Sequence, residues 1–265
     1  MLKDITLGQY FPGDTVVHRL DPRTKLLLVI IYIVGLFNSV GWASYAFVIL
    51  VTALSMAISK IKPRSALKGL KPLVIIIILT AVLNIFYTDG TPIVEGWIIT
   101  WEGIERAVMM SLRIILLIVG TFMLTYTTSP IALTDGLEIM MGPLKKIKIP
   151  VHEMSMMMSM ALRFIPTLIE ETDKIMSAQK ARGADFDSGN LFQRAKALLP
   201  ILVPLFVSAF RRADELAVAM ESRCYHGGEG RTRMKQLKMQ GIDAWALVLG
   251  ATFLSAIFTM KHFGL

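Results

Sequence analysis

The sequence predicts an all-α integral membrane protein with about five transmembrane helices and long amphipathic helices at the cytoplasmic face. Apolar residues make up 54% of the 265 residues and charged residues only 18%, whereas soluble domains carry roughly 25% charged residues. Charge is absent from three long runs, which are Leu26–Ser59, Leu73–Thr88 and Ile114–Pro130. Basic residues flank these runs, so the membrane explains the net charge of +8 better than nucleic acid does.

The apolar runs divide into five expected spans. The run Leu26–Ser59 would reach roughly 50 Å as one helix, which is too long for a hydrocarbon core of about 30 Å. Asn38, Ser39 and Gly41 interrupt it and predict a break. The expected spans are then 24–40, 42–60, 70–88, 105–127 and 242–262. Four tryptophans lie near their ends, as an aromatic belt requires: Trp42, Trp97, Trp101 and Trp245.

The distribution of Lys and Arg predicts the orientation. The loops 38–44 and 89–104 contain neither residue, whereas the segment 128–241 contains many. The positive-inside rule therefore places the N-terminus and 128–241 in the cytoplasm of a multi-pass protein of the cell membrane. The expected division is 1–127 with four transmembrane helices, 128–241 as a cytoplasmic coupling-helix segment, and 242–265 with the last span.

The cytoplasmic segment is expected to hold a short helix at 130–141 and two long helices at 151–182 and 191–223. An alternative interpretation makes spans of Val151–Ile169 and Ala197–Phe210. We favour amphipathic helices at the membrane surface, because the first stretch contains charged residues and the second reaches only about 21 Å.

The two long helices end in a weak internal repeat. The shared pattern is Asp-x-(Ile/Leu)-x-x-Ala-x-x-x-Arg, which places Asp173 with Asp214 and Arg182 with Arg223. Arg182 alone could mark only a helix end, because Arg favours the helix dipole and Gly183 favours a left-handed cap. The second end has Arg without a following Gly, so glycine capping does not explain what the ends share.

Several stretches together resemble the transmembrane T component of energy-coupling factor (ECF) vitamin transporters, of the type shared by several substrate-binding proteins. These stretches are Gly8–Gly13, His18–Leu26, Leu162–Leu168, Ala178–Gly183 and Arg212–Ala217. The resemblance implies a complex with two ATPase subunits and a membrane-embedded substrate-binding S component. It implies a scaffold that transmits ATP-driven motion to that component for the uptake of a vitamin or micronutrient.

The same resemblance assigns the ATPase-docking residues. They are Ala181, Arg182 and Gly183 on the first helix and Ser222, Arg223 and Cys224 on the second. The usual second motif is Ala-Arg-Gly, so Ser222 and Cys224 depart from it. A residue other than glycine enters the left-handed region at a cost. We therefore expect the second helix end to be shaped differently, with Gly227 and Gly228 making the turn.

Other residues have less specific signals. Met154, Met157 and Met158 are candidates for S-component contact because methionine adapts to different partners, although a core-facing or lipid-facing stripe is an equal alternative. Arg113 lies deep in the fourth span, where a charge requires a partner or a polar cavity. Structural pairing is the favoured role for Arg113, and Arg163, Asp173 and Asp214 are further candidates for structural or coupling roles.

The sequence contains no Gly-x-x-x-x-Gly-Lys-(Ser/Thr) motif, no catalytic serine or zinc-protease motif, and no histidine spacing typical of a metal site. We therefore expect a chain that is not an enzyme and binds no cofactor, with ATP and Mg²⁺ on the partner ATPases and no nucleic-acid partner. The alternative function is a self-contained secondary transporter, which would need a midplane site and inverted repeats.

Overall fold

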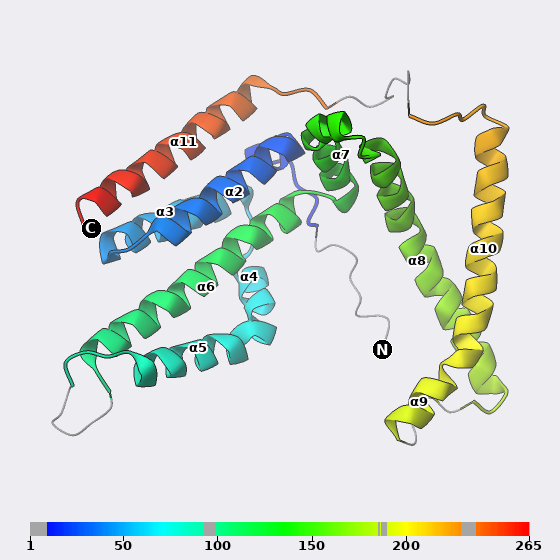
Figure 1. Ribbon diagram of the computed structural model, residues 1–265, viewed down its shortest axis with the longest axis horizontal. Helices are drawn as coiled ribbons and strands as arrows, with labels where there is room; N and C mark the ends of the chain where they lie inside the picture. The colour runs from blue at the N-terminus through cyan, green and yellow to red at the C-terminus, as the bar shows by residue number, and fades with distance from the viewer. Residues whose placement is uncertain (1–9, 93–98, 185, 187–189, 229–236, 265) are drawn as a thin grey trace. The chain divides into compact units, whose positions relative to one another are not determined.

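The computed structural model describes residues 10–92, 99–184, 186, 190–228 and 237–264 (Figure 1). Within these residues the secondary structure is helical, apart from one isolated β-bridge between Pro92 and Thr100. The all-α fold class is confirmed. Among the residues named above, Gly8, Gln9 and Trp97 lie outside the described residues.

The chain forms two compact units. The bundle unit comprises Gly8–Gly136 and Leu237–Leu265, and the hairpin unit includes Leu137–Gln236. The chain passes from one unit to the other within α7. The finer division at residues 127, 128, 241 and 242 stays a prediction.

The bundle unit contains the apolar helices. Its elements are α1 (Val16–Arg19), α2 (Pro22–Asn38), α3 (Trp42–Ser59), α4 (Pro63–Leu70), η2 (Lys71–Leu73), α5 (Val74–Tyr87), α6 (Trp101–Thr127), most of α7 (Pro130–Met140) and α11 (Gly241–His262). Four helical stretches in the described residues are long and apolar enough to cross a membrane: Trp42–Ser59, Pro63–Tyr87, Trp101–Thr127 and Gly241–His262. The first expected span corresponds to α2, whose 17 residues lie at the lower limit of spanning length.

Local signals explain where these helices begin and end. Asp21 caps α2 by accepting the Arg23 N–H at 2.9 Å, and Pro22 occupies the first helical position. The predicted interruption is confirmed, because α2 ends at Asn38 and α3 begins at Trp42. The expected span 70–88 begins with the 3₁₀ turn η2 and continues as α5, and the short helix α4 precedes it. Pro72 lies in the turn.

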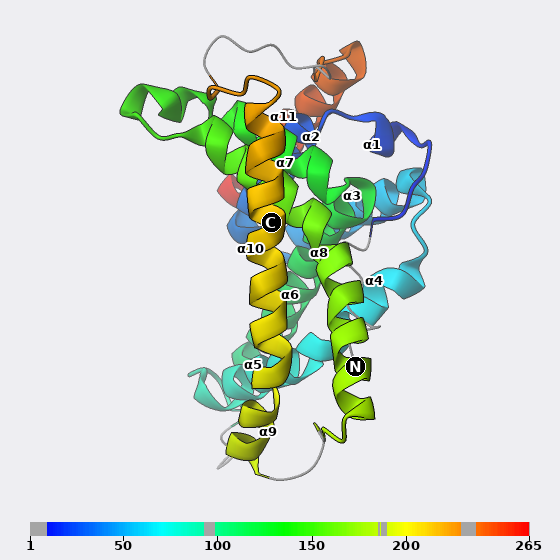
Figure 2. The same cartoon turned by 90° about the vertical axis from the view of Figure 1, so that its right-hand side faces the viewer.

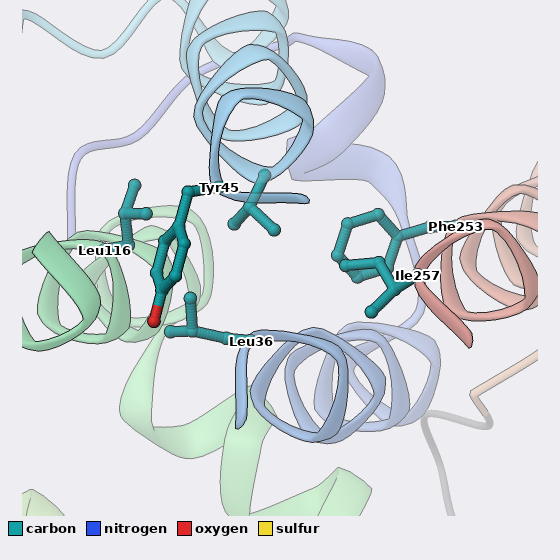
Figure 3. Close-up of a cluster of buried hydrophobic side chains, with 6 residues drawn as sticks. Leu36, Tyr45, Leu116, Phe253 and Ile257 are labelled. Atoms are coloured by element: carbon teal, nitrogen blue, oxygen red, sulfur yellow. The ribbon is translucent and has the colours of Figure 1, made fainter. Parts of the chain in front are cut away.

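The bundle is centred on α2. Leu36 of α2, Tyr45 and Val48 of α3, Leu116 of α6, and Phe253 and Ile257 of α11 form a cluster of buried side chains (Figure 3). Glycines let the helices approach closely: a Cβ at Gly35 would lie 2.6 Å from the Phe253 ring, and one at Gly120 would overlap the Tyr32 ring. The outward surface is apolar, with Ile75 of α5 76% exposed, as a helix facing lipid requires.

A buried polar cluster joins the ends of four helices, α1, α2, α6 and α11. Lys25 is 5% exposed and donates from Nζ to the carbonyl oxygens of His18 at 3.1 Å and Thr127 at 2.8 Å. Asp243, at the start of α11 and 1% exposed, accepts the Asp21 N–H at 2.8 Å. Each buried charge therefore has hydrogen-bond partners, which is the condition for its burial.

We predict that Gly120→Leu destabilises the bundle. The Tyr32 ring cannot move aside freely, because its hydroxyl hydrogen-bonds to Thr52 Oγ1 at 2.9 Å and the Leu116 carbonyl at 3.0 Å. Overpacking of this kind costs about 1–3 kcal/mol. Thermal unfolding of the purified protein in detergent should show a lower Tm for Gly120→Leu. Gly142→Leu is the control, because a Cβ at Gly142 meets nothing within 4 Å. Equal Tm values for the two variants would contradict the close contact.

Candidate functional site

The hairpin unit is built on two long helices. After the 3₁₀ helix η3 (Gly142–Ile147), α8 (Val151–Ala181) is followed by the short α9 (Leu191–Ala197) and by α10 (Leu199–Glu221). The second long helix, expected as one piece at 191–223, is interrupted at Leu198. Pro200 follows this interruption in the first turn of α10, where proline is tolerated. Neither α8 nor α10 is among the helices that meet the criteria for a membrane span in the described chain.

The two helices run antiparallel, side by side (Figure 2). Gln179 near the end of α8 contacts the Pro200 carbonyl near the start of α10, at 3.5 Å. Further along the pair, Arg212 of α10 donates to Glu171 Oε2 of α8 at 3.3 Å. The C-terminal ends of α8 and α10 therefore lie at opposite ends of the pair.

Arg212 connects the helices in two ways. Besides the ion pair with Glu171, its guanidinium lies 5.6 Å from the centre of the Phe164 ring of α8. Around it, an apolar cavity of about 300 Å³ separates the helices and is lined by Met157, Met160 and Leu216, among others. Packing along this part of the pair is incomplete, so the charged and aromatic contacts of Arg212 contribute to holding the helices together.

The first helix end is a Schellman motif. Gly183 adopts φ +88°, its N–H donates to the Lys180 carbonyl at 3.0 Å, and the Ala184 N–H donates to the Gln179 carbonyl at 3.0 Å. Arg182 is the residue immediately before the left-handed position and is exposed. Its backbone is held by the cap, while its side chain remains available to a partner.

The second helix end has the same motif without glycine. Cys224 adopts φ +54°, its N–H donates to the Glu221 carbonyl at 2.8 Å, and the Tyr225 N–H donates to the Met220 carbonyl at 3.0 Å. The expectation of a differently shaped end with the turn at Gly227 and Gly228 was wrong. The hydrogen bonds to the last carbonyl groups of α10 stabilise this end by more than the left-handed backbone conformation of Cys224 costs.

The two ends are consequently equivalent in backbone geometry. Arg182 and Arg223 each stand one residue before the left-handed residue, and both are exposed. Since α8 has 31 residues, it extends about 46 Å. The antiparallel pairing therefore separates the arginines by a distance on the order of 40 Å.

The candidate methionines lie on the surface of α8. Met154, Met157 and Met158 are 44%, 59% and 50% exposed, and their spacing places them on one side of the helix. Asp173 is half-buried, whereas Asp214 and Arg163 are exposed. Among the residues that the structure describes, these three form no ion pair with one another.

Arg113 belongs to the bundle unit and has polar partners there. It donates from Nε to the Tyr45 hydroxyl at 2.9 Å and from Nη2 to the Ser39 carbonyl at 2.9 Å. The rings of Tyr45 and Phe37 lie within 6 Å of the guanidinium. These contacts connect α6 to the break between α2 and α3, which is a structural role.

An apolar stripe on α10 was not predicted from the sequence. Its members are exposed and follow the i, i+3, i+4 spacing of one helix face: Leu199, Leu202, Val203, Phe206, Val207 and Phe210. The absence of charge between Ala197 and Phe210 was the available signal. Such a face, 62% exposed at Phe206 and 69% at Phe210, is typical of a protein or membrane contact.

Comparison with known proteins identifies similar chains over nearly the whole length. The family described as cobalt transport protein, CbiQ, matches residues 13–235. Three similar proteins are each named energy-coupling factor transporter transmembrane protein EcfT. The one from Clostridium kluyveri is 57% identical over 92% of both chains. The one from Ruminiclostridium cellulolyticum is 50% identical over 99% of both. The one from Bacillus subtilis is 46% identical over 98% of this chain and all of its own length.

We predict opposite effects of exchanging the two left-handed residues. Cys224→Gly should stabilise the end of α10 by about 0.5–1 kcal/mol, because glycine adopts positive φ without steric cost. Gly183→Ala should destabilise the end of α8 by about 1 kcal/mol. Hydrogen exchange of the terminal amides, followed by mass spectrometry, measures both effects. Slower exchange after Gly183→Ala, or faster exchange after Cys224→Gly, would contradict the shared cap.

Proposed function

The chain belongs to the CbiQ family of transporter membrane proteins, and we propose that it is the coupling subunit of an ECF importer. In this role it joins two ATPase subunits to a membrane-embedded S component that binds a vitamin or micronutrient. The observation that carries the proposal is the pair of equivalent helix ends, each with an exposed arginine, at opposite ends of one antiparallel pair.

The separation of the arginines favours two docking partners. A single groove accepts one helix end, and the ends are on the order of 40 Å apart. Two similar ATPase subunits can instead each accept one end, because Ala181–Gly183 and Ser222–Cys224 have the same backbone path. Equivalent ends on one chain therefore suit a motor with two like halves.

Arginine suits these positions chemically. Its planar guanidinium stays charged and forms paired hydrogen bonds with carboxylates or carbonyl oxygens in a groove. The cap also fixes the backbone beneath it, so less conformational freedom is lost when the side chain binds. ATP and Mg²⁺ would bind the partner ATPases in this arrangement, which leaves a mechanical role for the chain.

Exposed apolar residues offer a surface for the S component. Met154, Met157 and Met158 can adapt to different partners because methionine side chains are flexible. The apolar stripe on α10 adds a second surface of the same character. In the proposed arrangement the hairpin unit and the N-terminus face the cytoplasm, since basic residues concentrate there.

We predict that Arg182→Glu/Arg223→Glu abolishes ATPase recovery. Reversing both charges should repel the carboxylates of the two docking grooves. Detergent pull-down of the tagged chain from its own host should recover two ATPases and a small membrane protein with the wild type. Arg182→Glu alone and Arg223→Glu alone should each retain about one ATPase per chain, because the other helix end is intact.

The matched control is Lys174→Glu/Arg211→Glu. It makes the same charge change at one exposed residue on each helix, away from the tips. ATPase recovery should equal that of the wild type, and circular dichroism should show both variants folded. If Arg182→Glu/Arg223→Glu recovers as much ATPase as the wild type, the ATPases dock elsewhere on the chain. If the wild type itself recovers no ATPase, the coupling function is rejected and a self-contained secondary transporter is favoured.

We also predict that Met154→Asp/Met157→Asp/Met158→Asp removes the S component while the ATPases stay bound. Burying a carboxylate without a partner is costly, whereas both helix ends are unchanged. Quantifying the recovered subunits in the same pull-down measures the effect. Unchanged recovery of the small membrane protein would leave the α10 stripe as the contact surface.

A further inference from the structure

A cavity lies near the C-terminal ends of α3 and α6 in the bundle unit. It has a volume of about 590 Å³ and is bordered by the N-terminal segment around α1 and by the α3–α4 junction. Tyr126 joins the two walls: its carbonyl accepts the Phe11 N–H at 3.0 Å, and its hydroxyl donates to the Ser65 carbonyl at 3.1 Å. Both walls of the cavity are therefore tied to the same residue of α6.

The N-terminal wall is also fixed internally. The His18 ring hydrogen-bonds to Thr15 Oγ1 at 2.6 Å and to the Phe11 carbonyl at 3.0 Å. These contacts fold the segment back over α3. Because both ring nitrogens of His18 are already hydrogen-bonded, His18 shapes the wall and is not expected to bind a ligand in the cavity.

The cavity is basic at its α3–α4 side. Lys60 and Lys62 both line it, against one carboxylate, that of Asp14. Lys60 adopts φ +55° as the cap of α3. Glycine takes this conformation at lower cost, so replacing Lys60 by glycine removes the charge without straining the backbone.

An apolar slot adjoins the basic cavity. It has a volume of about 300 Å³ and lies among α2, α3, α6 and α11. Ile58 lines both the cavity and the slot, so the two adjoin at that residue. Leu28, Ser55 and Leu124 are among the lining residues of the slot. Lys25 also lines it, but its ammonium group is occupied by two carbonyl oxygens.

We propose that this site binds one anionic phospholipid, with the phosphate in the basic cavity and one acyl chain in the slot. A basic pocket at span ends, where headgroups lie, is complementary to an anionic headgroup. The adjoining apolar slot is complementary to a hydrocarbon chain and not to a free anion. This inference requires only that the chain is a membrane protein, so it is independent of the proposed docking to ATPases.

Native mass spectrometry of the purified full-length chain tests the proposal. The protein is incubated with equal amounts of phosphatidylglycerol and phosphatidylcholine that carry the same acyl chains. Wild type should retain phosphatidylglycerol at least about tenfold better, since each lysine near an anionic headgroup contributes to binding. Lys60→Gln/Lys62→Gln should remove this preference. Lys60→Gly/Lys62→Gln removes the same charges while relieving the left-handed position, which guards against loss of folding.

Lys146→Gln/Lys148→Gln is the matched control. Lys148 also caps a helix in the left-handed region, at φ +63°, and both lysines are exposed. This control should keep the lipid preference. Equal loss in the control would show a general effect of surface charge and overturn the proposal.

Two further arms separate a lipid from other ligands. Ser55→Phe should fill the slot and reduce phosphatidylglycerol retention without removing a charge; unchanged retention would overturn the proposal. Inorganic phosphate should fail to displace the lipid, because it cannot occupy the slot. Displacement by millimolar phosphate would instead identify a site for a soluble anion.

Discussion

The first turn of α2 contacts the two places where the chain leaves and re-enters the bundle unit. Pro22 packs against Gly136, at the point where the chain leaves the bundle. Arg23 donates to the Leu237 carbonyl at 2.9 Å, where the chain returns. Asp21 supports both contacts, since its carboxylate caps α2 and pairs with Arg23 at 3.1 Å. One helical turn thus contacts both chain segments at which the bundle unit ends, around Gly136 and at Leu237.

This turn is stable because its buried charges are paired. Asp21, Arg23, Lys25 and Asp243 bring opposite charges together and use backbone carbonyls and N–H groups as further partners. Removing one member of such a cluster costs about 3–5 kcal/mol, because the others remain buried without compensation. The two long helices of the hairpin unit, in contrast, are joined by the partly exposed Arg212–Glu171 pair. Such exposed pairs contribute about 0–1 kcal/mol to the free energy of unfolding. The bundle is therefore expected to be the more rigid of the two units.

Sequence alone predicts the apolar helices and the break after Asn38, because charge-free runs and mid-run polar residues are strong local signals. It also identifies Arg182 and Arg223, since their repeat is visible in the residues. It does not predict the left-handed Cys224, because that conformation depends on satisfying carbonyls at the end of α10 and not on the propensity of cysteine. Likewise, the partners of Arg113 come from helices α2 and α3, far away in sequence, so only the folded structure reveals them.

The antiparallel pairing of α8 and α10 also has a mechanical meaning. Because the two capped ends lie on opposite sides of the contact at Arg212 and Glu171, equal and opposite forces applied to them form a couple. A couple produces rotation without net translation. Because each end lies far from the contact, a small force at an end produces a large torque about the contact. An antiparallel helix pair with a binding site at each end is therefore suited to transmit rotation. A parallel pair with both binding sites at one end would instead transmit translation.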